Sequence, residues 1–278
     1  MKLLKPLPPG RSLDQVLNHY RVEKAIAEKL KNANREERKQ IYATMYDELF
    51  QQVPDHSRLK RREDERLTKI VNKEKMTLVD EFLSPPSTFV EFAPGDCRFS
   101  MEVARFVKTV YAIDISDQRS HTQTPPDNFV LIVYDGYQLE QIPGDEIDLI
   151  FSDQFLEHLH PDDTRLHLEL AYHLLKSGGK YVFRTPHAFT GPADISQYFS
   201  DEPQGFHLKE WTYNEFRSLL EEIGFSRLIG IRKVRSFPLK LPFYYFQLCE
   251  QLFSWLPLRL NRALSRYFLP SITIVAIK

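Results

Sequence analysis

The segment TFVEFAPGDCRFSMEVARFV, residues 88–107, places a short apolar run before a turn of small residues and a helix-like stretch. Further short runs rich in Val, Ile, Phe and Tyr are expected to be strands, and they lie at 110–114, 128–135, 146–153 and 180–186. Helix-like stretches follow at 164–176 and 212–224. Apolar strands that alternate with helices predict a parallel sheet with helices on both faces.

The residues before this central region show a different pattern of apolar side chains. Residues 12–82 carry apolar side chains at helical spacing and end at the proline pair of SPPS, 84–87. We therefore expect an N-terminal helical cap over 1–86 and a second domain over 87–278. The helix at 164–176 is expected to end at the glycine pair Gly178-Gly179 as a C-cap.

The charge of the 278-residue chain is unevenly distributed although its formal total is −1. Residues 1–80 carry a net +5, residues 81–225 a net −14 and residues 226–278 a net +8. The near-zero total and the acidic centre predict no nucleic-acid partner. Two cysteines cannot form a disulfide framework or a four-thiolate zinc site. Without an apolar run that suits a signal peptide or a spanning helix, a cytoplasmic protein is expected.

Small residues and carboxylates lie where the first three predicted strands end. Ligands of open α/β sheets bind beyond the carboxyl ends of the strands. The turn FAPGDCR, 92–98, lets the backbone approach a ligand, and the helix after it offers free N–H groups. Asp114, nineteen residues after Gly95, could take both hydroxyls of a ribose. Asp135, in an Asp-Gly pair, suits an exocyclic amine such as that of adenine.

A dinucleotide cofactor is one candidate for this turn. Its fingerprint requires Gly at positions one, three and six, where the chain has Ala93, Gly95 and Arg98. Arg98 should obstruct close packing around a pyrophosphate, which disfavours an NAD-dependent oxidoreductase.

In their order and spacing, the motifs over about 88–235 resemble those of the class I S-adenosylmethionine-dependent methyltransferases. The resemblance rests on VEFAPGDCRFS, YAIDIS, YDGYQL, DLIFSDQFLEHLHPDD and LLKSGGKYVFRTP. The stretch GPADISQYFSDEPQGFHLKEWTYNEF, 191–216, is similar to a bacterial subgroup linked with sugar or cell-surface polymer modification. The implied fold is α/β, a doubly wound Rossmann-like sheet of seven strands. Its last strand, 271–278, is antiparallel and lies next to the fifth, and a helical insert over about 237–270 separates it from 225–234.

The resemblance also implies S-adenosyl-L-methionine as the cofactor. The residues at the corresponding motif positions are Glu91, Phe92, Ala93, Gly95, Cys97, Asp114, Ile115, Asp135, Gly136, Asp153 and Gln154. Among these, Glu91 is implied to hold the methionine amino group, directly or through water. Ala93 and Cys97 stand where the family pattern has glycine, and Ala disfavours positive φ. A non-catalytic, methyltransferase-like binding module therefore remains an alternative.

Acid–base side chains follow the fourth and fifth predicted strands, where the family's reacting centre lies. Methyl transfer is an in-line displacement, and a hydroxyl acceptor also needs a base. The candidates are Glu157, His158, His187 and His207, each of which could instead simply pack or hydrogen-bond within its loop. Glu157 and His158 adjoin, but no third ligand appears at a telling spacing, so we predict no metal.

We therefore expect methyl transfer to a small-molecule or carrier-linked acceptor, as O-methylation of a sugar, lipid or related metabolite. The insert 237–270 is rich in apolar side chains and carries four cationic residues against Glu250 alone. One interpretation is a helical pair packed on the domain or on a second copy, since the sequence does not fix the oligomeric state. The other is a surface that meets an anionic membrane or a lipid-linked acceptor, which would make the protein peripheral to the membrane.

Overall fold

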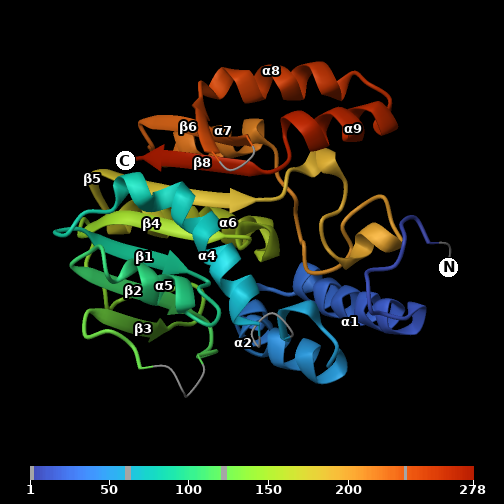
Figure 1. The fold of residues 1–278 in the computed structure, drawn as a ribbon, viewed down its shortest axis with the longest axis horizontal. Helices are drawn as coiled ribbons and strands as arrows, with labels where there is room; N and C mark the ends of the chain where they lie inside the picture. Colours follow the sequence, from blue (N-terminus) through green and yellow to red (C-terminus); the bar gives the residue numbers. More distant parts are fainter. Residues whose placement is uncertain (1–2, 60–63, 120–123, 235–236) are drawn as a thin grey trace.

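The computed structural model describes residues 3–59, 64–119, 124–234 and 237–278 and is built around one sheet (Figure 1). Its strands are β1 (Thr88–Phe92), β2 (Thr109–Asp114), β3 (Phe129–Val133), β4 (Ile147–Asp153), β5 (Leu175–Thr185), β6 (Arg227–Val234), β7 (Phe237–Leu241) and β8 (Ile272–Ile277). They lie in the order β3-β2-β1-β4-β5-β8-β6-β7. The strands β1 to β5 are parallel to one another, whereas β8 is antiparallel to both β5 and β6. The predicted doubly wound α/β sheet, with its antiparallel last strand next to the fifth, is confirmed.

Within the described residues the sheet has eight strands, so the prediction of seven was wrong. The extra strand, β7, occupies the first residues of the segment that was expected to be wholly helical. It pairs antiparallel with β6 and with no other strand. Pro238 is tolerated there because an edge strand does not need every backbone N–H for the ladder. The rest of the insert is helical, as predicted.

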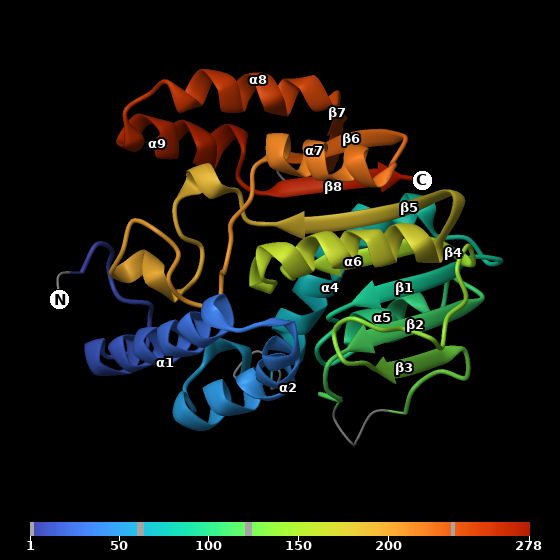
Figure 2. The ribbon, with the colours of Figure 1, turned by 180° about the vertical axis from the view of Figure 1, so that it is seen from behind.

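Helices cover both faces of the sheet. The helices are α1 (Leu13–Asn32), α2 (Arg35–Gln52), α4 (Glu65–Val79), α5 (Arg98–Val103), α6 (Pro161–Leu174), α7 (Tyr213–Ile223), α8 (Phe243–Ser254) and α9 (Leu258–Phe268). Figure 1 shows α4 and α5 in front of one face, and Figure 2 shows α6 and α7 in front of the other. A separate apolar cluster fills the space on each side of the sheet. No helix of the described segments is both long and apolar enough to cross a membrane.

The glycine pair after α6 does not cap the helix, contrary to the prediction. The helix ends at Leu174, and β5 starts at once and runs through Gly178 and Gly179. Gly178 has a φ of 77° and donates its N–H to the carbonyl of Lys278 at 3.0 Å. A Cβ on Gly179 would lie 2.8 Å from the carbonyl oxygen of Lys176. The pair therefore bends the start of β5 beside the end of β8.

The N-terminal helices lie across the carboxyl edge of the sheet. Apolar side chains of α1 and α2 form one cluster with Phe206 and Leu208, which belong to the loop between β5 and α7. Each helix begins with a capping box, at Ser12 and at Asn34, which satisfies backbone N–H groups of the first turn. The cap is thus fastened to loops that follow the sheet.

A buried ion pair joins this cap to the sheet domain. The guanidinium of Arg38 in α2 contacts both carboxylate oxygens of Asp163 in α6, at 2.7 Å each. The hydroxyls of Tyr42 and Tyr137 donate to the same carboxylate at 3.0 and 2.9 Å. Arg38 and Asp163 are both buried, so each charge depends on the other for compensation.

We predict that Asp163→Ala lowers the free energy of unfolding by about 3–5 kcal/mol, because it leaves the Arg38 guanidinium buried without a counter-charge. Urea unfolding followed by circular dichroism measures this loss. Glu222→Ala is the matched control, since it removes the carboxylate of an exposed pair with Arg165. A loss as large in the control as in Asp163→Ala would contradict the prediction.

Candidate active site

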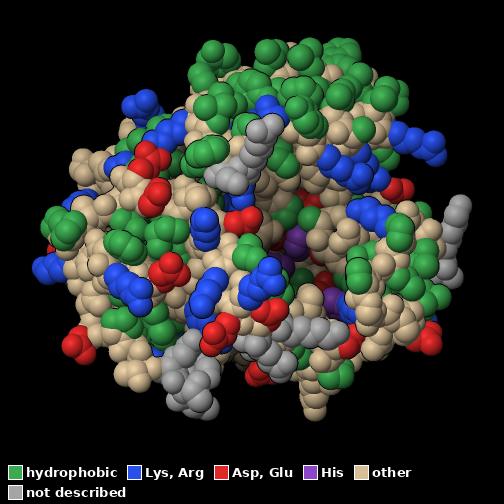
Figure 3. Space-filling model, in the orientation of Figure 1, with side chains coloured by type: hydrophobic (Ala, Val, Ile, Leu, Met, Phe, Trp, Pro, Cys, Tyr) green, Lys and Arg blue, Asp and Glu red, His purple; other side chains and the backbone are tan. Residues whose placement is uncertain are grey.

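The carboxyl ends of β1, β2 and β4 meet at one place on the sheet edge. The register pairs Phe92 of β1 with Ile113 of β2 on one side and with Ser152 of β4 on the other. The residues that follow these three strands are therefore close neighbours. Figure 3 shows the molecule hollowed on this side, with histidine side chains at the bottom of the hollow.

The turn after β1 has the backbone geometry of a glycine-rich loop although two of its positions are not glycine. Ala93, Gly95 and Cys97 have φ values of 53°, 61° and 60°. Ala93 and Cys97 thus adopt the left-handed conformation that favours glycine. A Cβ added to Gly95 would meet no atom within 4 Å, so the space beside this residue is open to a ligand.

Asp114 at the end of β2 holds this turn in place. Its carboxylate accepts hydrogen bonds from the backbone N–H groups of Gly95, at 3.2 Å, and Ile115, at 2.8 Å. The side chain is buried, and burial raises the pKa of Asp114 to about 6 despite these donors. The structure therefore brings together Gly95, Asp114 and Ile115, as the motif positions imply.

Glu91, inside β1, is completely buried and has two partners. The hydroxyl of Ser100 donates to one of its carboxylate oxygens, and the ammonium of Lys75 in α4 lies 3.0 Å from the other. The ring of Phe92 points into the apolar core and packs 4.6 Å from the ring of His167. Phe92 can therefore offer a ligand only its backbone.

Two cationic residues of the cap, which sequence reasoning missed, face the predicted cofactor carboxylates. Lys75 contacts Glu91, and Lys39 of α2 lies 2.7 Å from Asp135. In the sequence both lysines lie in helices of mixed charge, so only the tertiary fold distinguishes them from surface lysines. Asp135 also accepts two backbone N–H bonds that hold the turn of Gly136, whose φ is 90°.

The residues at the end of β4 are held by β5. Arg184 donates two hydrogen bonds to the carboxylate of Asp153, at 2.6 and 2.8 Å. The N–H of Gln154 donates to the carbonyl of Arg184 at 2.8 Å, and the φ of Gln154 is 55°. This strained residue turns the chain toward the acid–base side chains that follow it.

Three of the four predicted acid–base residues form one cluster. Glu157 and His158 belong to the short 3₁₀ turn η2 (Leu156–His158), and His207 comes from the loop before α7. The N–H of Leu208 donates to the carbonyl of Glu157 at 2.8 Å, which fixes that loop beside η2. The rings of His158 and His207 lie edge to face with centroids 5.1 Å apart.

The environments of the two histidines give them different protonation states. The Nδ1 atom of His158 lies 3.0 Å from the carbonyl oxygen of Phe206, which can only accept. The proton is therefore on Nδ1 and Nε2 keeps a free lone pair. Burial, with the nearby His207 and Arg58 cations, holds the pKa of His158 well below its usual value.

For His207, burial lowers the pKa, but the hydrogen bond to Glu210 at 2.8 Å and the carboxylates of Glu157 and Asp194 outweigh it and raise the pKa to about 9. Burial also raises the pKa of Glu157 to about 7. One Glu157 oxygen accepts from Thr185 at 2.9 Å, while the buried Oε1 atom has no hydrogen-bond partner among the described residues. The cluster thus combines a neutral histidine, a cationic histidine and a carboxyl that titrates near neutral pH.

His187 lies outside this cluster. It is completely buried, its Nε2 atom lies 2.7 Å from Glu250 of α8, and its Nδ1 atom accepts from the N–H of Phe189 at 3.0 Å. Both ring nitrogens are therefore engaged within the fold. The structure gives His187 a packing and hydrogen-bonding role and does not support its prediction as a base.

Among the described residues, two sets of side chains are close enough for a divalent ion to bridge them. In each, three ligand atoms lie within 4.8 Å of one another, and the sets are Glu157, His158, His207 and His19, Glu23, His56. In these sets His19 lies 2.7 Å from Glu23 and His207 pairs with Glu210, whereas the Oε1 atom of Glu157 has no hydrogen-bond partner among the described residues. We therefore describe them as acid–base and ion-pair clusters.

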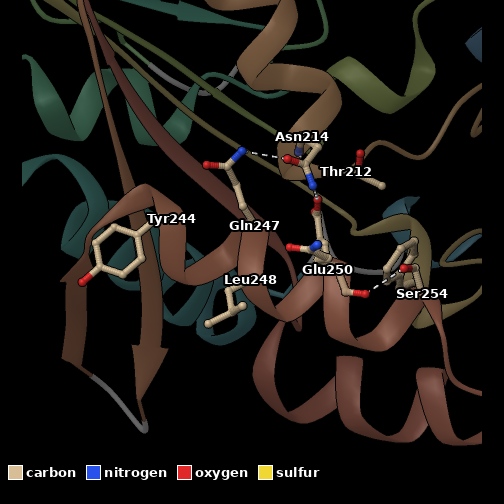
Figure 4. Close-up of a pocket in the computed structure, with 9 residues that line it drawn as sticks. Thr212, Asn214, Tyr244, Gln247, Leu248, Glu250 and Ser254 are labelled. Carbon is tan, nitrogen blue, oxygen red and sulfur yellow. Dashed lines mark hydrogen bonds between the residues drawn. The ribbon is translucent and has the colours of Figure 1, made fainter.

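A groove of about 610 Å³ lies apart from the strand ends, between the start of α7 and the outer side of α8 (Figure 4). Its polar lining is internally satisfied, because Gln247 donates to Asn214 and Asn214 donates to Glu250, at 2.7 Å each. Tyr244 and Leu248 form its apolar side. It contains none of the predicted cofactor residues.

Residues 90–183 match a protein-family model described as a methyltransferase domain. No curated protein sequence matches the chain. Residues outside 90–183, including the cap helices and the insert, lie beyond the matched segment.

Solved structures of methyltransferases share the fold at low sequence identity. One is the 1,6-didemethyltoxoflavin-N1-methyltransferase of Burkholderia thailandensis, solved with 1,6-didemethyltoxoflavin and S-adenosylhomocysteine, with 13% identity, 88% of this chain and 91% of that chain covered, and a TM-score of 0.53. Another is an S-adenosylmethionine-dependent methyltransferase of Archaeoglobus fulgidus, with 16% identity, 75% and 93% covered, and a TM-score of 0.50. A third is phosphoethanolamine N-methyltransferase 1 of Haemonchus contortus, with 15% identity, 66% and 40% covered, and a TM-score of 0.50.

Residues 90–183 thus match a methyltransferase domain, and the fold is the one that these S-adenosylmethionine-dependent methyltransferases share. Two of these structures were solved with S-adenosylhomocysteine, which is consistent with S-adenosylmethionine as the cofactor of this chain. The open space beside Gly95 and the buried carboxylates that end in the hollow fit that cofactor.

We predict that Ala93→Gly raises the free energy of unfolding by about 0.5–1 kcal/mol, because it relieves the left-handed strain of Ala93 at the cost of unfolded-state entropy. Gly95→Ala should lower it by about 1–2 kcal/mol, since the added Cβ has room but the φ of 61° becomes strained. Urea unfolding measures both values. A loss of stability in Ala93→Gly would contradict the strain at this position.

We also predict that S-adenosylhomocysteine binds about tenfold more weakly at about pH 5 than at about pH 7.5. The carboxylate form of Asp114 is the acceptor for ribose hydroxyls, and it is lost as the pH falls through its pKa of about 6. Isothermal titration across this range measures the change, with circular dichroism to check the fold at each pH.

Asp114→Asn is the control for this pH dependence. It should bind more weakly at every pH and should lose the tenfold change. Equal affinity of the unsubstituted protein at both pH values, or an unaltered pH profile in Asp114→Asn, would overturn the role given to Asp114.

Proposed function

We propose that this methyltransferase methylates a hydroxyl group of a small-molecule or carrier-linked acceptor, such as a sugar or a lipid. The observation that carries the proposal is the pair of His158 and His207 at the carboxyl edge, one neutral with a free Nε2 and one cationic. A hydroxyl acceptor needs both a proton acceptor and a group that stabilises negative charge on its oxygen.

The cofactor would be held by residues at the ends of β1, β2 and β3. Asp114 would take the ribose hydroxyls, and Asp135 with Gly136 would contact the adenine. Glu91 would take the methionine amino group, and Lys75, which lies 3.0 Å from Glu91, would pair with the methionine carboxylate. When bound, the cofactor supplies an electrophilic methyl group on a sulfonium centre.

His158 is the most suitable base in the cluster. His158 as a residue is half-buried, whereas Glu157 is completely buried and His207 is almost so. With Nδ1–H fixed on the carbonyl of Phe206, Nε2 can take the hydroxyl proton as the acceptor oxygen attacks the methyl carbon. The bound cofactor would supply the methyl group to this oxygen and would be released as S-adenosylhomocysteine, and the proton would remain on His158.

His207 and Glu157 assist that step from either side. The His207 cation, held by Glu210, favours negative charge on the acceptor oxygen. Glu157, whose pKa is about 7, can compensate the proton that His158 gains. Two of the similar solved structures are N-methyltransferases by their titles, and an amine acceptor would place the methyl group on nitrogen instead.

The experiment incubates the purified protein with ¹³C-methyl-labelled cofactor and with two acceptor fractions from cells, one of water-soluble metabolites and one of extracted lipids. Carbon NMR of the product identifies the atom that carries the label. We expect an O-methyl signal. A label only on nitrogen would show that the hydroxyl assignment is wrong.

We predict that His158→Ala lowers the rate of methyl transfer by about 10²–10⁴-fold while the affinity for S-adenosylhomocysteine stays unchanged. The loss follows from removal of the proton acceptor alone. His173→Ala, at an exposed position of α6, is the matched control and should keep full activity. Full activity of His158→Ala would remove His158 from the mechanism.

A further inference from the structure

The insert 237–270, which contains β7, α8 and α9, presents an apolar face to the outside of the molecule. Along α8, Tyr244, Leu248 and Leu252 follow each other at one-turn spacing and are 69%, 51% and 57% exposed. Further exposed apolar side chains of the insert are Phe237, Leu239, Trp255, Leu258, Leu260, Leu264 and Tyr267. Figure 3 shows hydrophobic side chains gathered over α8 and α9. We call this set the outer face of the insert.

The opposite side of α8 is fixed to the domain, so the outer face does not arise from a loosely attached helix. Phe246 stacks on Tyr213 of α7 with centroids 4.2 Å apart. Glu250 is buried and accepts from the N–H of Asn214 at 3.0 Å at the start of α7, as well as contacting His187. With these contacts satisfied, the apolar side chains on the other side still need a partner.

Cationic residues predominate in the segment that carries the outer face. From residue 226 to the end of the chain there are nine Lys and Arg residues, and the one acidic residue is Glu250. Because Glu250 lies buried under α8, it does not offset the cations at the surface. Arg262 and Lys240 pair with Asp201 and Glu81 of neighbouring elements, whereas Arg259 and Arg266 are exposed on α9. An apolar face with these exposed arginines at its border fits an anionic lipid surface.

The same charges disfavour a second copy of the chain as the occupant. A two-fold interface would bring the arginines of two α9 helices together, and the insert has no exposed carboxylate to pair with them. Opposite charge, by contrast, is what the phosphate groups of an anionic bilayer supply.

The outer face also lies beside the mouth of the proposed active site. Helix α9 packs on the 3₁₀ turn η3 (Ala188–Thr190), which follows β5 at the carboxyl edge. Arg266 donates to the carbonyl of Thr190 at 3.2 Å. In Figure 3, cationic side chains lie between the apolar area and the hollow. A molecule resting on this face would hold its hollow close to the lipid surface.

We propose that the outer face of the insert binds an anionic bilayer surface, with α8 and α9 lying in the interface, and that the methyl acceptor is presented from that bilayer. The second half of this inference rests on the proposed function, whereas the first depends only on the insert. An experiment can therefore contradict membrane binding without contradicting methyl transfer, and the reverse.

Sedimentation of the full chain with vesicles tests the first half. We expect binding to vesicles that contain phosphatidylglycerol in phosphatidylcholine, and weaker binding to vesicles of phosphatidylcholine alone or at high salt. Trp255, 85% exposed, should shift its fluorescence to the blue on binding, whereas Trp211 is already buried. Trp255→Phe should abolish the fluorescence shift.

The double variant Leu252→Ser and Leu258→Ser should bind these vesicles at least about tenfold more weakly. The matched control is Val130→Ser with Val133→Ser, which alters similarly exposed apolar residues on the edge strand β3. Unchanged affinity for S-adenosylhomocysteine in both variants shows that each is folded. Equal loss in the control, equal binding to neutral vesicles, or a dimer that only the insert variant dissociates would overturn the membrane surface.

The second half is tested by adding the cellular lipid fraction either within anionic vesicles or dispersed in detergent. The labelled methyl group should enter the lipid fraction, and the insert variant should lose this transfer from vesicles but retain it in detergent. Label confined to water-soluble products would overturn the bilayer as the source of the acceptor while leaving methyl transfer itself intact.

Discussion

The buried pair of Arg38 and Asp163 is the contact on which the arrangement of the site depends. It fastens α2 to the first turn of α6 and therefore holds the cap across the carboxyl edge of the sheet. Each of these buried charges needs the other as its counter-charge. The hydroxyls of Tyr42 and Tyr137 donate two further hydrogen bonds to the carboxylate of Asp163. If the pair separated, Lys39 would leave Asp135, and the loop that carries His207 would lose the apolar cluster that supports it.

The cap also balances the charge of the cofactor edge. The segment from 81 to 225 has a net charge of −14, and several of its carboxylates converge where parallel strands end. Lys75 and Lys39 reach two of these carboxylates from helices outside the sheet. Asp114 accepts backbone N–H groups instead, which lower its pKa, but burial outweighs them and raises that pKa to about 6. The overall charge of −1 therefore conceals a local pairing between domains of opposite sign.

The sequence predicted the sheet well because apolar runs in parallel strands are visible without tertiary contacts. It did not predict β7, whose five residues are mostly exposed and which forms only because β6 offers an unpaired edge. The glycine pair at 178–179 shows the same limit: a helix C-cap and a bend in a strand use the same residue, and only the pairing with β8 decides between them.

The residues of the candidate site also differ in how far the sequence could predict them. Carboxylates at strand ends were predictable from their position, whereas Lys39 and Lys75 were not, since their partners lie in other elements. His207 joins Glu157 and His158 through a loop closed by the Leu208 N–H, a contact between residues far apart in the chain. Ala93 was expected to resist positive φ, yet it adopts a φ of 53° because β1, β2 and Asp114 over-determine the turn.

Glu250 has a mechanical consequence. Its carboxylate joins α8 to His187, to Tyr213 and to Asn214, so the insert, the end of β5 and the start of α7 share one buried anchor. These contacts hold the insert rigidly against the sheet. If the outer face binds a surface as proposed, this rigid attachment sets the distance between that surface and the proposed active site. An acceptor held by the surface would then be methylated only at groups that lie at that distance.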